Sequence, residues 1–119
     1  MNKLSHDEIW ERVKKLQGQT LCTYVENEEN KILSVEDTGS KNDRVVIESR
    51  DTTPVREDIL AACDLLFLLR SLNRKKDLEW LAKPEKKTSS IIFRIVGEIT
   101  NDIAKVDLRS EPKILMKKS

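Results

Sequence analysis

Three short runs of strand-forming residues lie close together in the first half of the chain and limit the folds open to it. They span residues 20–25, 31–35 and 44–48, and the polar segments ENEEN and EDTGSKND separate them. Clusters of Asn, Asp, Gly and Ser between such runs are typical of turns, and short turns join neighbouring antiparallel strands. The sequence therefore predicts a three-stranded antiparallel meander.

A helix is predicted just before the meander, over residues 6–17. Ser5 and Glu8 have the spacing of a capping box, in which each side chain accepts a hydrogen bond from the backbone N–H of the other residue. Gly18 is placed to end the helix. Apolar residues recur at helical spacing and predict one buried stripe, formed by Ile9, Val13 and Leu16.

The second half of the chain predicts helices. Thr53 and Pro54 suit the N-cap and the first position of a helix that runs to about residue 72. Its segment DLLFLLRSL is apolar nearly all round, which indicates a central helix covered on more than one side. Asn73 is placed to cap a short third helix over residues 74–82.

The segment TSSIIFRIVGEI admits two interpretations. Its apolar residues match helical spacing, yet IIFRIV consists largely of strand formers. We favour a fourth helix, capped by Thr88 or Ser89. If residues 91–96 form a strand instead, that strand would pair with the alternating segment 104–108 as a hairpin after two helices, resembling the wing of a winged helix.

Together these patterns predict a single α+β domain over residues 1–119, a length typical of one domain. Residues 1–52 would hold the N-terminal helix and the three-stranded antiparallel sheet. Residues 53–119 would form a mainly helical part, a C-terminal trihelical subdomain of helix-turn-helix type. The pattern also allows a final strand in this part.

Composition and motifs exclude several classes of protein. No apolar run approaches the roughly 18 residues of a membrane helix, and the N-terminus MNKLSHDEIW lacks the apolar segment of a signal peptide. We therefore expect a soluble, cytoplasmic protein without a membrane partner. Cys22 and Cys63 show no close spacing, so neither a disulfide framework nor a metal site is expected, and both thiols should lie in the core. Phosphate-binding Gly-rich loops do not occur, and we expect no cofactor.

Positive charge gathers in the second half of the chain. Residues 1–60 carry 9 Lys and Arg against 13 Asp and Glu, whereas residues 61–119 carry 13 against 8. Eight basic residues flank the expected starts of the third and fourth helices: Arg70, Arg74, Lys75, Lys76, Lys83, Lys86, Lys87 and Arg94.

This arrangement favours a non-catalytic module that contacts nucleic-acid phosphates through a basic C-terminal helical face. Lys and Arg release counterions from a phosphate backbone, and hydroxyls with free N–H groups at a helix N-terminus bind phosphate oxygens. A run of charge is also typical of a merely solvated surface. The expected nucleic-acid contacts are Lys75, Lys76, Lys86, Lys87, Ser89, Ser90 and Arg94.

A second hypothesis is a protein-interaction or oligomerisation module, such as an antitoxin-like or regulatory partner. Surplus apolar residues would be exposed in a monomer and covered in a homodimer or by a protein partner. The candidates are Phe67, Leu68, Leu69 and the tail 114–116.

A third hypothesis is catalysis. The inferred order of a helix, three strands and a helix resembles the core of the PD-(D/E)xK nuclease family, in which an Asp, a Glu and a Lys bind a divalent metal and activate water. Asp37, Glu48 and Arg50 stand at the corresponding positions, with Arg in place of the family's Lys. His6, the single histidine, lies at a predicted helix start without a nucleophile motif beside it.

Nearly the whole chain also resembles a group of short, uncharacterised prokaryotic α+β domains. The resemblance rests on the segments IWERVKKLQGQTLCTYVENEENKILSVED, TTPVREDILAACDLL, LNRKKDLEWLA and SSIIFRIVGEI. In that group a helix leads into a Gly-Gln-Thr-Leu strand start, and a β-meander, a helix and a short turn precede the last helices. The resemblance implies an α+β fold with a helical C-terminal half, and it implies no activity and no site.

Overall fold

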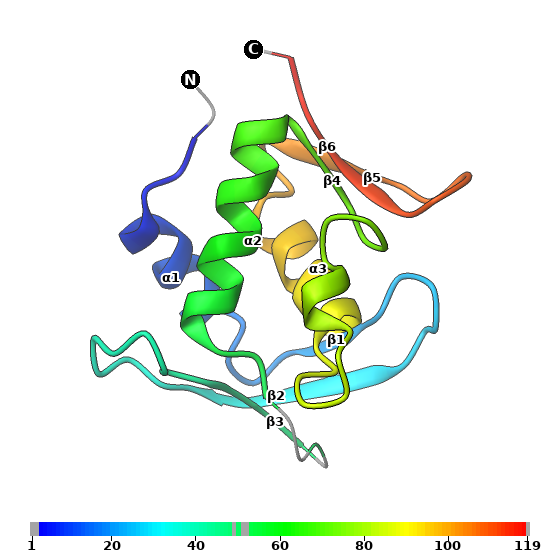
Figure 1. Ribbon diagram of the computed structural model, residues 1–119. Coiled ribbons are helices and arrows are strands. Elements are labelled where there is room, and N and C mark those ends of the chain that lie inside the picture. The colour runs from blue at the N-terminus through cyan, green and yellow to red at the C-terminus, as the bar shows by residue number, and fades with distance from the viewer. Residues whose placement is uncertain (1–2, 49, 51–52, 119) are drawn as a thin grey trace.

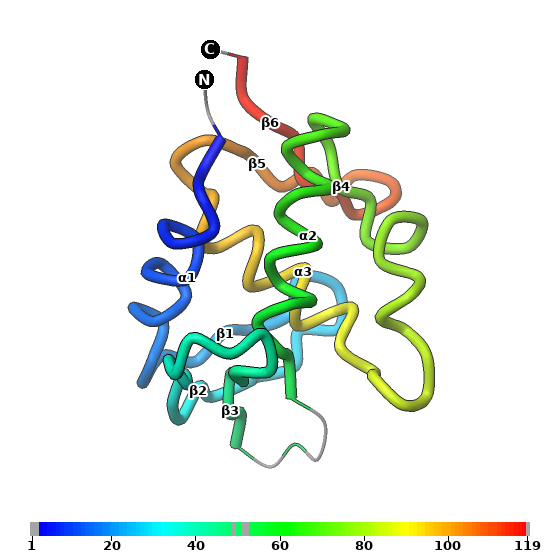
Figure 2. Tube along the Cα trace, turned by 60° about the vertical axis from the view of Figure 1, so that its left-hand side comes forward, coloured from blue at the N-terminus to red at the C-terminus, as the bar shows by residue number. Residues whose placement is uncertain are grey.

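Two three-stranded antiparallel sheets lie at opposite ends of the helices in the computed structural model (Figure 1, Figure 2). The structure describes residues 3–48, 50 and 53–118, and it confirms the predicted α+β class. Within these residues, every helix is too short or too polar to cross a bilayer. The helical elements are α1 (His6–Lys14), α2 (Arg56–Leu69), the 3₁₀ turn η1 (Glu79–Leu81) and α3 (Ser89–Ile99).

The first sheet is the predicted meander. Its strands pair in the order β1-β2-β3, and both pairs are antiparallel. Thr20 lies opposite Lys31, and Ile32 lies opposite Ile47. Alternate side chains of the sheet enter the core at Leu21, Ile32, Val45 and Ile47. The strands are β1 (Thr20–Cys22), β2 (Glu29–Val35) and β3 (Val45–Ile47).

Helix α1 begins with the predicted capping box. The Glu8 N–H donates to Ser5 Oγ at 3.1 Å, and the Ser5 N–H donates to Glu8 Oε1 at 3.0 Å. The α-helix ends at Lys14, earlier than predicted, and Gly18 follows in the left-handed conformation with a φ of 88°. The Gly18 N–H donates to the Ile32 carbonyl at 2.8 Å, so this turn joins the helix to strand β2.

Helix α2 begins later than predicted, because the residues before it pair with the first sheet. The Pro54 carbonyl accepts a hydrogen bond from the Val45 N–H at 2.9 Å, and Val55 forms a β-bridge with Arg44. Val55 is the N-cap residue, and its side chain makes no capping bond. Sheet pairing therefore overrides the local signals that predict a start at Thr53 and Pro54.

The predicted C-terminal trihelical subdomain of helix-turn-helix type is wrong. Helix α2 ends at Leu69, and Arg70 adopts the left-handed conformation with a φ of 65°. The next residues form strand β4 (Ser71–Asn73) instead of continuing the helix to residue 72. Of the predicted third helix over residues 74–82, only η1 is helical. Asn73 caps a turn instead, because its Oδ1 accepts hydrogen bonds from the backbone N–H groups of Lys75 and Lys76.

A second sheet takes the place of that subdomain. Strand β4 pairs with β6 (Lys113–Met116), which pairs in turn with β5 (Ala104–Asp107), all antiparallel. The final strand that the pattern allows over residues 104–108 is present as β5. The sequence patterns predict neither β4 nor β6. Leu72 and Ile114 face each other in this sheet and are fully buried, so the sheet closes one end of the core.

Helix α3 forms over the ambiguous segment, as the favoured interpretation predicts. Seven of its 11 residues are buried. The helix contacts α1, α2, β1, β5 and η1, so it occupies the centre of the core. Thr88 is its N-cap residue, as expected, but the Thr88 side chain makes no capping hydrogen bond.

Gly97 of α3 is a position where no side chain fits. A Cβ atom there would collide with the Tyr24 hydroxyl and would approach the ring to 3.0 Å. We predict that Gly97→Ala lowers the free energy of unfolding by about 1–2 kcal/mol, because overpacking outweighs the gain in helix propensity. In the Tyr24→Phe background the loss should shrink, since the nearest atom has gone. Urea unfolding of the four proteins measures both effects, and a more stable Gly97→Ala protein would contradict this packing.

Candidate functional site

The eight basic residues between positions 70 and 94 do not form one continuous basic face. Three of them form ion pairs with carboxylates of the described chain, which offset their charge. The pairs, with their N–O distances, are Arg74–Glu26 (2.8 Å), Lys86–Asp58 (2.9 Å) and Arg94–Glu98 (2.8 Å).

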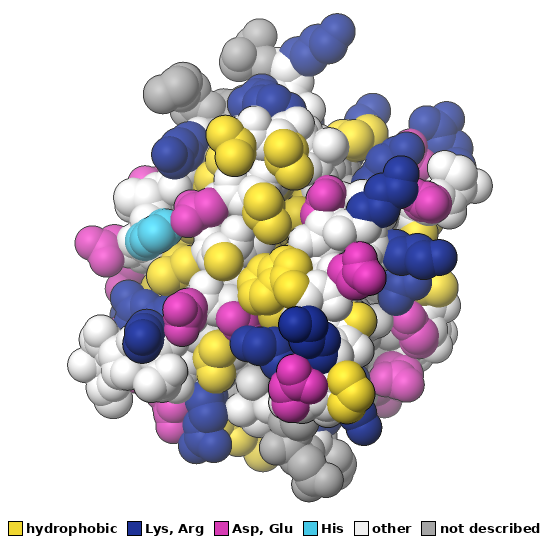
Figure 3. Space-filling view, viewed as in Figure 1, with side chains coloured by type: hydrophobic (Ala, Val, Ile, Leu, Met, Phe, Trp, Pro, Cys, Tyr) yellow, Lys and Arg dark blue, Asp and Glu magenta, His cyan; other side chains and the backbone are white. Residues whose placement is uncertain are grey.

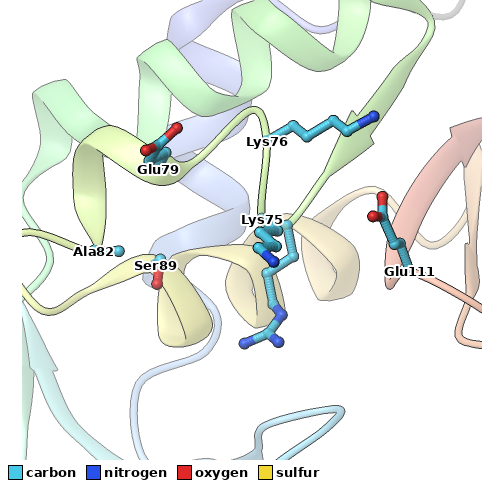
Figure 4. A pocket seen from close by; sticks show the side chains of 7 residues that line it. Lys75, Lys76, Glu79, Ala82, Ser89 and Glu111 are labelled. Atoms are coloured by element: carbon cyan, nitrogen blue, oxygen red, sulfur yellow. The ribbon is translucent and has the colours of Figure 1, made fainter.

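Part of the predicted nucleic-acid site does converge, at an open cavity of about 670 Å³ (Figure 4). The cavity lies between the turn that follows β4, the start of α3 and the turn between β5 and β6. Lys75, Lys76 and Ser89 line it, together with Arg74, Glu79, Ala82 and Glu111. Three of the seven predicted contacts therefore share one site.

The other four predicted contacts lie elsewhere. Ser90 is nearest, because its Oγ accepts a hydrogen bond from Arg74 Nη1 at 3.1 Å. Lys86 lines a separate hollow at the start of α2. Lys87 is exposed in the loop before α3, and Arg94 is partly buried within the fold.

Arg94 is held against the first sheet. Its Nε donates to the Cys22 carbonyl at 2.8 Å, and its guanidinium lies over the Tyr24 ring, 4.7 Å from Cζ to the ring centre. Strand β1 and the segment after it thus cover the side of α3 that carries Arg94. This side of the helix is closed to a nucleic-acid groove.

Carboxylates moderate the positive charge of the cavity. Glu111 accepts a hydrogen bond from Asn73 Nδ2 at 2.7 Å. That bond, and then the charge of Lys76, holds the pKa of Glu111 below its ordinary value. At the start of α3, Ser90 Oγ donates to Glu26 Oε2 at 3.2 Å. A carboxylate of the chain itself therefore lies where the helix dipole favours an anion.

The outward side of α2 exposes apolar side chains. Leu68 is 78% exposed and Leu69 is 49% exposed. Ala61 and Leu65, which precede them on the helix, are partly exposed, as is Trp80 of η1. Figure 3 shows apolar side chains in a column along α2. These five residues are called the α2 face.

Trp80 belongs to the same surface as α2 because Lys86 connects them. Lys86 Nζ lies 6.0 Å from the centre of the Trp80 ring and 2.9 Å from Asp58 Oδ2 on α2. Trp10, by contrast, is 1% exposed and lies in the core.

The apolar residues expected to be exposed divide into two groups. Leu68 and Leu69 are exposed, which confirms that part of the expectation. The expectation is wrong for Phe67 and Ile114, since both pack in the core, Ile114 at the centre of the second sheet. The other two tail residues, at positions 115 and 116, are partly exposed.

Carboxylates border the α2 face on both sides (Figure 3). Glu57 and Asp64 are exposed on the flank next to α1, where Asp64 Oδ2 lies 3.0 Å from His6 Nε2. On the other flank, Glu79 immediately precedes Trp80 and is exposed. In Figure 4 its carboxylate turns away from Ser89.

The three nuclease candidates do not converge. Strands β2 and β3 are antiparallel, so Asp37, which follows β2, and Glu48, which follows β3, lie at opposite ends of this pair. Asp37 pairs with Lys14 at 2.8 Å, and Arg50 Nε donates to Asn30 at 2.7 Å. Among the described residues, no group of three or more His, Cys, Asp or Glu is placed to hold a metal ion.

The cysteines are buried to different degrees. Cys63 is fully buried, and burial raises the pKa of its thiol, which stays protonated. Cys22 is only partly buried in β1. The expectation of a core thiol is therefore confirmed for Cys63.

Comparison of the chain with protein-family models, curated proteins and solved structures finds no match.

Sequence reasoning does not identify the carboxylates that border the α2 face. The helical spacing does contain a signal for them, because residues 57, 61, 64, 65 and 68 lie on one side of a helix. Recognising it requires knowing that this side is open to solvent, which depends on what the rest of the chain covers.

The pKa of Glu111 reports the hydrogen bond from Asn73 and, after it, the positive charge of the cavity. We predict a value below that of an ordinary glutamate, and we expect Lys75→Ala with Lys76→Ala to raise it, because two cations that favour the ionised form are removed. Lys31→Ala, on the first sheet, should leave it unchanged. Carbon-13 NMR of the glutamate carboxyls across a pH titration provides the measurement, and an unshifted pKa in the wild type would contradict the geometry.

Proposed function

We propose that this protein is a non-catalytic module that binds another protein on the α2 face. The observation that carries the proposal is the 78% exposure of Leu68 on a helix whose other side lies in the core. Burial of one leucine side chain contributes about 1.5–3 kcal/mol, so a partner that covers this side chain and its neighbours gains affinity. An exposed apolar patch with a polar border is typical of an interaction site.

A hollow beside Leu68 supports the same proposal. A cavity of about 860 Å³ lies between the start of α1 and the second half of α2. Leu4, Phe67 and Leu68 supply its apolar lining, and the polar groups come from Lys3, Ser5, His6 and Asp64. Protein interfaces centre on side chains that enter such hollows. The hollow therefore suits an apolar side chain of the partner.

A second candidate function is nucleic-acid binding, and the cavity in Figure 4 favours it, because Lys75 and Lys76 are exposed on its wall. The Arg94 side of α3 is covered, so contacts would be made to phosphates rather than to base edges. Such binding would be independent of base sequence.

Photo-crosslinking from the α2 face tests the leading proposal. We expect a photoreactive residue at Leu65 to give a discrete crosslinked protein in extracts of the cells that produce this chain. The same residue at Leu33, which is 47% exposed on the first sheet, should give none. Leu68→Ser should abolish the product without changing the urea midpoint, because exposed side chains contribute little to stability.

The purified partner then supplies the decisive measurement. We expect isothermal titration calorimetry to show that it binds the wild type and that Leu68→Ser weakens binding by roughly tenfold or more. Equal crosslinking from Leu65 and Leu33, or a partner indifferent to Leu68→Ser, would contradict the proposal.

Fluorescence anisotropy with random-sequence duplex DNA tests the second candidate. We expect affinity to fall as salt rises. Lys75→Ala with Lys76→Ala should weaken binding more than Lys86→Ala with Lys87→Ala, because Asp58 already neutralises Lys86. Absence of binding at low salt, or equal effects of the two variants, would remove this candidate.

A further inference from the structure

We infer that the partner of the α2 face is a positively charged amphipathic segment, whose apolar side chains are flanked by lysine or arginine. The inference rests on the proposed function and deepens it, because it gives the chemistry of the partner. It depends on the carboxylates that border the α2 face.

Helix geometry places two of these carboxylates beside the apolar column on the α1 side. Glu57 and Asp64 are seven positions apart, and Ala61 and Leu68 each follow one of them by one turn. The two acids therefore stand about 10 Å apart along the helix axis. Glu57 forms no ion pair within the described residues, and Asp64 pairs with His6 at 3.0 Å. Both carboxylates stay exposed to a cation brought by a partner.

The opposite border has mixed charge, because Glu79 lines the same cavity as Lys75 and Lys76. Glu79 is exposed next to Trp80, and no ion pair engages it in the part of the chain that the structure describes. Lys86 reaches over the Trp80 ring, but Asp58 offsets its charge at 2.9 Å. Figure 3 shows the α2 face as an apolar strip with carboxylates on both flanks and with Lys or Arg side chains above and below it.

A second copy of this chain fits that border poorly. When two α2 helices pack face to face about a twofold axis, an antiparallel arrangement sets the Glu57 and Asp64 border against itself. A parallel arrangement sets it against the border that holds Glu79. The antiparallel arrangement therefore brings like charges together across the interface. A positively charged segment of a different protein removes this repulsion, and the carboxylates then guide its approach.

Two synthetic helical peptides test the inference. They share leucines at helical spacing and differ only in the flanking residues, which are lysine in one and glutamate in the other. Binding is followed by the emission of Trp80, because Trp10 is 1% exposed and contributes a constant background. We expect the lysine peptide to shift the emission to shorter wavelength and to bind roughly tenfold more tightly at low salt, with a ratio that falls as salt rises.

Matched charge reversals locate the effect on the protein. Glu57→Lys with Asp64→Lys should abolish or invert the preference for the lysine peptide. Glu29→Lys with Glu48→Lys makes the same change of net charge on the first sheet and should leave the preference unaltered. All four side chains are exposed, and thermal unfolding confirms that each variant folds.

Several results would overturn the inference. Equal affinity for the two peptides would overturn it. If Leu68→Ser then abolishes the binding of both peptides, the proposed function still stands. An equal loss of the preference for the lysine peptide in both charge-reversed variants would also overturn it, because the net charge of the protein would then govern binding. If the lysine peptide does not bind while crosslinking from Leu65 persists, the inferred positive charge of the partner is refuted and the proposed function stands. A dimer in sedimentation that Leu68→Ser dissociates would place a second copy on the face.

Discussion

Burial of helix α3 is the constraint on which the rest of the structure depends. The helix contacts α1, α2, β1, β5 and η1, so these elements gain buried apolar surface by packing round it. Helix α2 buries Ile59, Ala62, Cys63 and Leu66 on its inner side. A single core leaves α2 no second apolar surface for its outer side. The exposure of Leu68 follows from this geometry and is not a local accident of one side chain.

The same constraint disperses the basic residues. Because β1 and the segment after it lie against α3, Arg94 contacts Tyr24 and Glu26 reaches Arg74. The Arg74–Glu26 pair joins residues 48 positions apart, and the Lys86–Asp58 pair joins residues 28 positions apart. Two of the eight basic side chains are thus paired with acids from distant segments. The accessible surface includes a cavity of mixed charge and an apolar strip that carries carboxylates on its α1 side.

The sequence predicts the elements whose causes are local. The capping box at Ser5 and Glu8, the polar turns of the meander and the helical spacing within α3 all act within a few residues. Strand β4 has a distant cause, because Leu72 gains its place by pairing with Ile114. Local patterns show that α2 is apolar nearly all round and predict that other elements cover this helix on several sides. The second hypothesis predicts the exposure of Leu68 and Leu69 but also that of the buried Phe67, because the side of α2 that stays exposed depends on where every other element packs.

Leucine methyl NMR tests the role of the α2 face most directly. The exposed leucines are distributed over the molecule, with Leu33 on the first sheet and Leu108 after β5 as internal references for Leu68 and Leu69. On addition of the lysine-flanked peptide, methyl shifts should concentrate at Leu65, Leu68 and Leu69. Shifts of equal size at Leu33 and Leu108, or none on α2, would contradict the assignment of this face as the binding surface.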